Sequence, residues 1–152
     1  MIFGGIALAV LGMTYGLYYA VFVEHQTLDQ MGGSLAAAFV GVAERNWQQS
    51  ESSLASYRDA KYRYVRQVDV HSHWGGLAML MIVLGVAFDE LRFGERTRVL
   101  LAWSLLIGSG VFPLGVMLQT VNLQILGSVL AIGGSGLVIL GLGATAVGFA
   151  RA

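Results

Sequence analysis

The sequence contains no cysteine, a single proline and few charged residues, and each shortage excludes a class of structure. Without cysteine the chain cannot form disulfide bonds, thiolate metal sites, iron–sulfur clusters or covalently attached c-type haem. Any metal ion or haem must therefore be held by His, Met, Tyr or a carboxylate. The formal net charge is +0, and Lys and Arg form no long block, so nucleic acid is not an expected partner.

Apolar residues dominate what is present. The chain is 56% hydrophobic and 12% charged, with a mean hydropathy of +0.68. A soluble domain of this size could not bury so much apolar surface. No Asp, Glu, Lys or Arg occurs between Val99 and Ala150, and this stretch is long enough for two membrane helices of about twenty residues each. We therefore expect an integral membrane protein whose surface contacts the lipid bilayer.

The apolar runs predict an all-α, four-helix membrane bundle that takes up the whole chain, residues 1–152, as a single membrane domain. The expected spans are about 2–23, 70–88, 99–118 and 123–150. A signal peptide is the alternative interpretation of the first run. However, no Lys or Arg precedes that run, and it is longer than the apolar region of a usual signal peptide. We expect an uncleaved membrane anchor.

The segment between the first two spans, about 24–69, is expected to be extramembrane and partly helical. Leu28, Met31 and Leu35 recur at helical spacing, which is typical of an interfacial or docked helix. Farther on, from Leu54 to His71, apolar and aromatic residues recur every three or four positions without proline or glycine. The second span is therefore expected to begin either near residue 70 or as a longer helix that projects from the membrane.

The charges near the short loops predict the orientation. Positive residues on one side of the predicted bundle are Arg92, Arg96, Arg98 and Arg151. The positive charges of the long first loop weigh less, because the rule applies to short loops. We expect both termini in the cytoplasm and the protein in a bacterial inner membrane. An aromatic belt is expected at the opposite interface, made of Tyr18, Tyr19, Phe22 and Trp74.

The 21 glycines favour close contact between helices. Gly12 and Gly16 form a GxxxG motif, and Gly127 begins a similar spacing of small residues in the last span. Such spacing lets helix backbones approach closely in lipid. One interpretation is packing within a single bundle. The other is self-association through the last span, for example at Gly134 and Gly136, which would make the chain a homo-oligomer or a subunit of a larger membrane complex.

The three histidines, His25, His71 and His73, fall at one face of the predicted bundle. Residues two positions apart on a helix differ by about 200°. His71 and His73 therefore cannot both face the core, unless the helix begins at a cap on Ser72. Three interpretations remain open: interfacial histidines that hydrogen-bond to neighbours, haem b binding, or a Cu or Zn site made from His25, His71, His73, Glu24 and Asp69.

A resemblance to a known family is carried by residues 62–81, with the sequence YRYVRQVDVHSHWGGLAMLM. This stretch resembles the entrance to the second helix of haem-copper oxidase subunit I, and also small membrane proteins that share that entrance. In the oxidase family a histidine near the outer end of this helix ligates a low-spin haem b. The resemblance implies that His73 or His71 is such a ligand. Because the last two spans contain no histidine, a complete oxidase centre is excluded within this chain.

His73 is the favoured ligand on the sequence alone. It lies deeper along the second span than His71, and the following Gly75 and Gly76 would leave room for a flat macrocycle. Asp69, one turn earlier, is the expected partner of its second ring nitrogen. The second axial ligand would come from His25, a methionine or another subunit.

The sequence thus predicts a membrane redox or metal-binding module, suited to electron transfer, that holds one haem b or one metal ion at its outer face. The alternative is a non-catalytic structural or scaffold subunit that packs through glycine-rich helices. No catalytic motif is present, so no independent enzyme activity is expected. A channel or carrier is disfavoured because no span has a charged residue near its middle.

Overall fold

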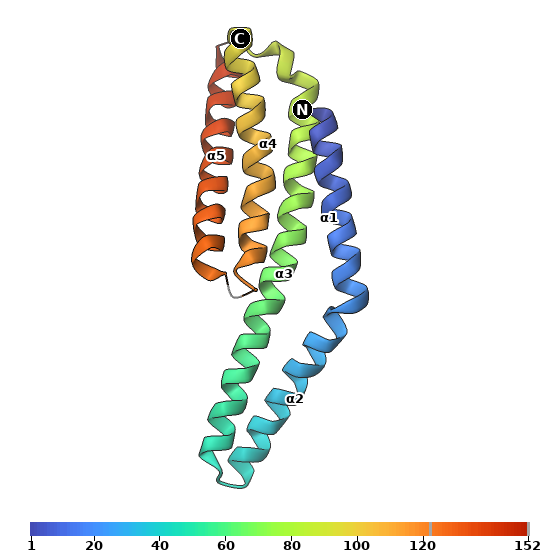
Figure 1. Ribbon diagram of the computed structural model, residues 1–152, viewed down its shortest axis with the longest axis vertical. Coiled ribbons are helices and arrows are strands. Elements are labelled where there is room, and N and C mark those ends of the chain that lie inside the picture. The colour runs from blue at the N-terminus through green and yellow to red at the C-terminus, as the bar shows by residue number, and fades with distance from the viewer. Residues whose placement is uncertain (122, 152) are drawn as a thin grey trace.

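The computed structural model describes residues 1–121 and 123–151. Within these residues all regular secondary structure is helical, without a strand, as the sequence predicts (Figure 1). The elements in chain order are α1 (Ile2–Phe22), α2 (Glu24–Ala43), α3 (Trp47–Ala87), the short 3₁₀ helix η1 (Phe88–Glu90), α4 (Glu95–Leu118) and α5 (Gln124–Ala150).

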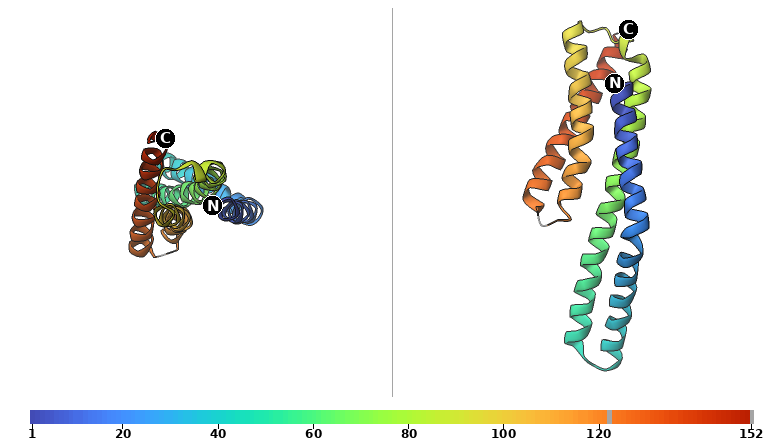
Figure 2. Two further views of the ribbon diagram at one scale, coloured as in Figure 1. Left: turned by 90° about the horizontal axis from the view of Figure 1, so that it is seen from above. Right: turned by 45° about the vertical axis from the view of Figure 1, so that its right-hand side comes forward.

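Four of these helices, α1, α3, α4 and α5, are long and apolar enough to cross a membrane. Large apolar side chains such as Phe3 and Ile125 point outward, 84% and 85% exposed, as lipid-facing residues do. The α3 helix lies between α1 on one side and the α4–α5 hairpin on the other (Figure 2). The length and composition of these helices thus confirm the prediction of an integral membrane protein built as a helical bundle.

The second predicted span differs in its start. The α3 helix begins at Trp47 and runs for 41 residues without a break, so it does not begin at a cap on Ser72. The expectation of one longer helix is confirmed, and the point near residue 70 at which this helix would enter the membrane stays a prediction. Asn46 caps the helix, because its side-chain Oδ1 accepts a hydrogen bond of 3.2 Å from the backbone N–H of Gln49.

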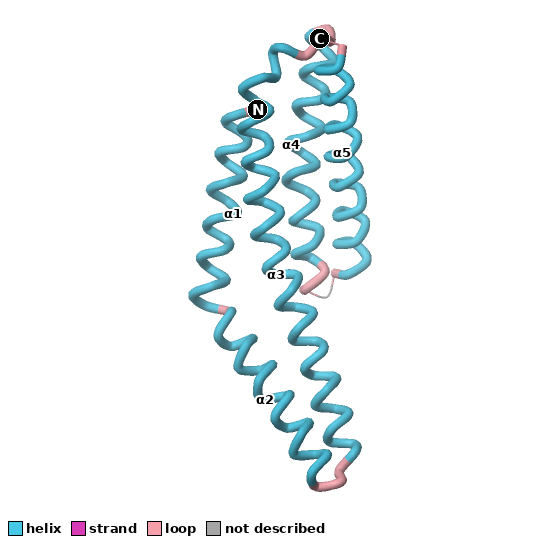
Figure 3. Tube along the Cα trace, turned by 180° about the vertical axis from the view of Figure 1, so that it is seen from behind, coloured by secondary structure: helices cyan, strands magenta, loops and turns pink. Residues whose placement is uncertain are grey.

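Beyond the membrane bundle, α2 and residues 47–69 of α3 form an antiparallel helix pair, which we call the stalk (Figures 1 and 3). The segment predicted to be partly helical is therefore helical except for the step at Val23 and the turn at residues 44–46. In that turn Arg45 takes a left-handed conformation, with φ of 56°. This turn reverses the chain within three residues, whereas at Val23 the chain only bends and α2 continues away from the bundle (Figure 1).

The other boundaries shift by only a few residues. The third helix starts at Glu95 rather than residue 99, because its first turn contains charged residues that the apolar run excluded. The fourth starts at Gln124. Both termini lie at the same end of the bundle (Figure 1), and the Arg151 guanidinium lies 5.7 Å from the Phe93 ring in the α3–α4 connection. The membrane side on which they lie stays a prediction.

Glycines hold the helices together in pairs. An added Cβ on Gly12 would lie 2.9 Å from the Cβ of Trp74, so α1 and α3 are in close contact there. On the other side of the bundle, an added Cβ on Gly134 would lie 2.8 Å from the Cα of Phe112 in α4. Gly134 therefore packs within the chain and is not free to mediate self-association. Gly136 has nothing within 4 Å of an added Cβ and remains available for it.

Candidate functional site

The GxxxG motif of α1 receives the imidazole of His71. The ring nitrogen Nδ1 of His71 lies 2.8 Å from the backbone carbonyl oxygen of Gly12. An added Cβ on Gly16 would come within 2.6 Å of His71 Cε1, so the ring occupies the space that the absent side chain leaves. The GxxxG motif of α1 therefore packs within the bundle, which was one of its two interpretations. This packing places His71 of α3 in contact with the α1 backbone.

This contact fixes the proton on the His71 ring. A carbonyl oxygen can only accept, so Nδ1 must donate its hydrogen, and the neutral ring then carries its lone pair on Nε2. The residue as a whole remains exposed. One turn farther along α3, added Cβ atoms on Gly75 and Gly76 would meet nothing within 4 Å. His71 therefore offers a nitrogen ligand beside an open stretch of helix backbone.

His73 belongs to a different face of α3. Its ring centroid lies 4.6 Å from that of Phe112 in α4, with 43° between the ring planes. The two histidines thus point toward different helices, as the 200° separation predicts. The bundle provides no common site for them. Asp69, the expected partner of His73, instead has its Oδ2 atom 4.0 Å from Arg66 NH1.

The remaining predicted ligands lie near the start of α2. His25 is exposed, and Glu24 Oε1 accepts a hydrogen bond of 3.4 Å from the Tyr64 hydroxyl. Across the described residues, no three His, Asp or Glu side chains come close enough to hold one metal ion. The five residues predicted for a Cu or Zn site therefore do not converge within a single chain.

No family model, curated protein or solved structure matches this chain. The resemblance of residues 62–81 to the oxidase helix accordingly stays a prediction. The geometry of the chain itself is what any functional argument must use.

Trp74 is a core residue, and its predicted place in an aromatic belt is wrong. It is 5% exposed and packs with Val70 and Val116 in the bundle core. The Tyr15 ring meets it edge-on, with centroids 5.6 Å apart. Gly12 accounts for this burial, because its missing side chain lets Trp74 turn inward against α1. The indole Nε1 is buried without a hydrogen-bond partner.

The sequence interpretation also missed a polar group at the base of the stalk. Gln67 Nε2 donates a hydrogen bond of 2.9 Å to Thr120 Oγ1, which joins α3 to the end of the α4–α5 hairpin. Tyr19, at the end of α1, is 7% exposed, so its predicted place in the aromatic belt is also wrong. Polar side chains at the ends of several predicted spans were the signal in the sequence that could have indicated this contact. However, the sequence alone does not show which span ends lie next to each other.

Proposed function

We propose that this chain is a membrane haem b-binding module without independent catalytic activity, and that His71 is an axial ligand. The observation that carries the proposal is the 2.8 Å contact between His71 Nδ1 and the Gly12 carbonyl. Histidines that ligate metals commonly donate their other ring N–H to a carbonyl or carboxylate, which fixes the tautomer and makes the ligating nitrogen more basic. His71 already has this partner, whereas residues 1–121 and 123–151 provide no such partner for His73.

The surroundings of His71 fit a flat macrocycle. Gly75 and Gly76 leave the adjoining helix surface without side chains, and no cysteine competes as a ligand. Bound haem b would supply one-electron redox chemistry. The residues of this chain would hold the ring and set the basicity of its nitrogen ligand.

The proposal includes a second chain. Because the His73 ring lies against Phe112 on another face of α3, the proposed second axial ligand is a residue of another copy of the chain or of a partner subunit. The exposed position of His71 supports such an arrangement. A Cu or Zn ion shared between chains is the alternative occupant of the same nitrogen, and elemental analysis distinguishes it from haem.

A Soret band tests the proposal directly. The full chain would be produced with ample haem, purified in mild detergent and examined by absorbance and elemental analysis. His71→Asn is the critical variant, because an asparagine amide can still donate to Gly12 but offers no ligand nitrogen. We expect it to lose the Soret band, while His25→Asn, at an exposed position, keeps it.

Two results would count against this function. The absence of both Soret absorbance and stoichiometric Fe, Cu or Zn in the wild-type protein would leave the histidines with a structural role. Loss of the band in His73→Asn but not in His71→Asn would overturn the assignment of the ligand.

A structural role in a larger assembly is the second candidate function. It is supported by the outward glycines of α5, since Gly133, Gly136 and Gly143 have nothing within 4 Å of an added Cβ. Smooth surfaces of this kind permit close helix contact between chains in lipid. The variant Gly136→Leu should lower the oligomer mass in native mass spectrometry, and an unchanged mass would argue against self-association through this face.

A further inference from the structure

A polar cavity of about 290 Å³ lies where the stalk leaves the membrane bundle. It forms because the chain bends at Val23, whose φ and ψ of −122° and −39° separate α1 from α2. Three helices contribute polar side chains to its wall: Tyr19 from α1, Gln26, Thr27 and Gln30 from α2, and Arg63 and Gln67 from α3.

Two polar side-chain atoms at this cavity make no close hydrogen bond. The Tyr19 hydroxyl is buried, in a residue that is only 7% exposed, and its contact with the Thr27 side chain is a long one. The Oε1 atom of Gln67 is also buried and unpartnered, while its amide nitrogen is held by Thr120 at 2.9 Å. Buried polar atoms are nearly always paired in proteins, because leaving one unpaired costs free energy. Both atoms therefore retain the capacity to hydrogen-bond to a polar ligand.

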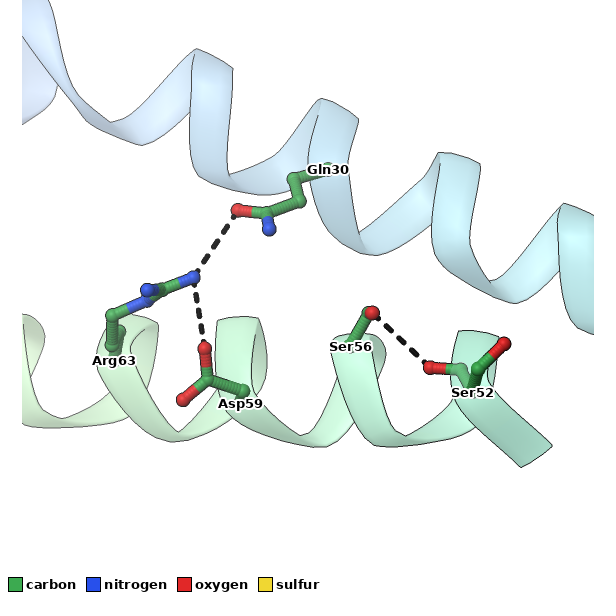
Figure 4. Close-up of polar contacts among 5 residues, drawn as sticks. All are labelled: Gln30, Ser52, Ser56, Asp59 and Arg63. Atoms are coloured by element: carbon green, nitrogen blue, oxygen red, sulfur yellow. Dashed lines mark hydrogen bonds and ion pairs between the residues drawn. The ribbon is translucent and has the colours of Figure 1, made fainter.

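Arg63 gives the cavity a positive group. Its NH2 atom lies 3.1 Å from Asp59 Oδ2 and 3.4 Å from Gln30 Oε1, and these two contacts hold the guanidinium between α2 and α3 (Figure 4). A guanidinium carries five N–H donors. Both contacts use the same nitrogen, so donors on the other nitrogens remain for an anion. Phosphate is a group that arginine binds especially well.

The cavity lies at the level where lipid headgroups occur. Tyr19 is in the last turn of the α1 span. On the neighbouring helix, Gln67 bonds to Thr120 at the end of the α4–α5 hairpin. Both therefore mark the same boundary of the apolar bundle, and the stalk begins beyond it (Figure 1).

We propose that this cavity binds the phosphoglycerol group of an anionic lipid such as phosphatidylglycerol. The phosphate would accept hydrogen bonds from Arg63, a glycerol hydroxyl would donate to Gln67 Oε1, and the Tyr19 hydroxyl would bond to either group. A choline headgroup fails this requirement because it has no hydrogen to donate. The volume of about 290 Å³ is near the lower end of ligand cavities, about 300–1,000 Å³, and suits a headgroup.

Native mass spectrometry of the full chain in mild detergent tests the site. The protein would be titrated with phosphatidylglycerol, phosphatidylcholine and phosphatidylethanolamine with identical acyl chains. We expect one phosphatidylglycerol per chain, bound about tenfold more tightly than phosphatidylcholine. Phosphatidylethanolamine should bind with intermediate affinity, because its ammonium can also donate to Gln67 Oε1 but repels the Arg63 guanidinium. Lipid binding is measured without reference to haem. A negative result would therefore refute the lipid site without affecting the proposed haem site, and the loss of the haem proposal would leave the lipid site untouched.

Two conservative variants make the test specific. Tyr19→Phe removes a hydroxyl that makes only a long contact with Thr27, so it should weaken lipid binding several-fold with little change in Tm. Its control is Tyr18→Phe, on the same helix but 55% exposed. Arg63→Gln should weaken binding about tenfold, and Arg58→Gln, exposed on the same helix, serves as its control.

Free glycerol 1-phosphate identifies the source of the ligand. Displacement of the lipid by millimolar glycerol phosphate would support a site that also takes the soluble group, and retention of the lipid would support a membrane source. Equal binding of all three lipids would overturn the proposal. So would unchanged phosphatidylglycerol binding in both Tyr19→Phe and Arg63→Gln.

Discussion

Replacing Gly134 with alanine would insert a methyl group between two helix backbones. The added Cβ would lie 2.5 Å from the backbone nitrogen of Phe112 and 2.8 Å from its Cα. Carbon atoms in contact prefer about 3.5–4.0 Å, so α4 and α5 would have to separate locally by about 1 Å. Backbone atoms cannot rotate away as a side chain does, and the separation would weaken neighbouring contacts at Gly108 and Gly115.

The expected magnitude follows from comparison with the adjacent glycine. Gly133 has nothing within 4 Å of an added Cβ, so Gly133→Ala gains only the helix preference of alanine, about 0.8–1.0 kcal/mol. Gly134→Ala has the same gain but also the overpacking cost, about 1–3 kcal/mol. The difference between the two variants cancels the helix preference and isolates the clash.

Thermal unfolding in detergent, followed by circular dichroism, measures this difference. At about 2–4 °C per kcal/mol for a chain of this size, Gly134→Ala should melt roughly 2–12 °C below Gly133→Ala. Equal Tm values for the two variants would refute the close α4–α5 contact. If instead Gly133→Ala were the less stable variant, Gly133 would have to face a neighbour, such as a second copy of the chain.

Two further predictions concern the stalk and the topology. Asn46→Ala removes the cap on α3 and should cost about 1 kcal/mol, so amide exchange in residues 47–50 should become roughly fivefold faster, whereas Asn46→Asp should keep wild-type rates. Single cysteines at the exposed positions Glu51 and Gly94 should label from opposite membrane sides, with Glu51→Cys accessible from outside. Labelling of Gly94→Cys from outside would reverse the predicted orientation.

The membrane helices were predictable because length and hydropathy alone determine them. The run without charge from Val99 onward gave two of the four helices almost directly. The start of α3 was harder to predict, because the first part of this helix is polar and hydropathy does not detect it. Periodicity indicated a helix there, but only the Asn46 cap, a local feature with many possible positions, fixes where it begins.

The candidate site was less accessible to sequence reasoning. Helix geometry predicted correctly that His71 and His73 diverge. It could not say which of them meets α1, because that depends on how α3 is rotated against its neighbours. The glycines pose the same difficulty, since Gly134 and Gly136 look alike in the sequence, while one is packed against Phe112 and the other is open.

The unbroken α3 helix has a mechanical consequence. Its 41 residues span about 60 Å at 1.5 Å per residue, of which about 35 Å belong to the stalk. The path through α1 and α2 is interrupted at Val23. Only α3 is therefore a continuous helix from the tip of the stalk to the far end of the bundle. With a pivot at the bundle boundary, a tilt of about 5° displaces the tip by roughly 3 Å over this arm. A force applied to the tip would therefore act on α3 as on a lever. It would move His71 and Trp74 of α3 relative to Gly12 and Gly16 of α1, which they contact.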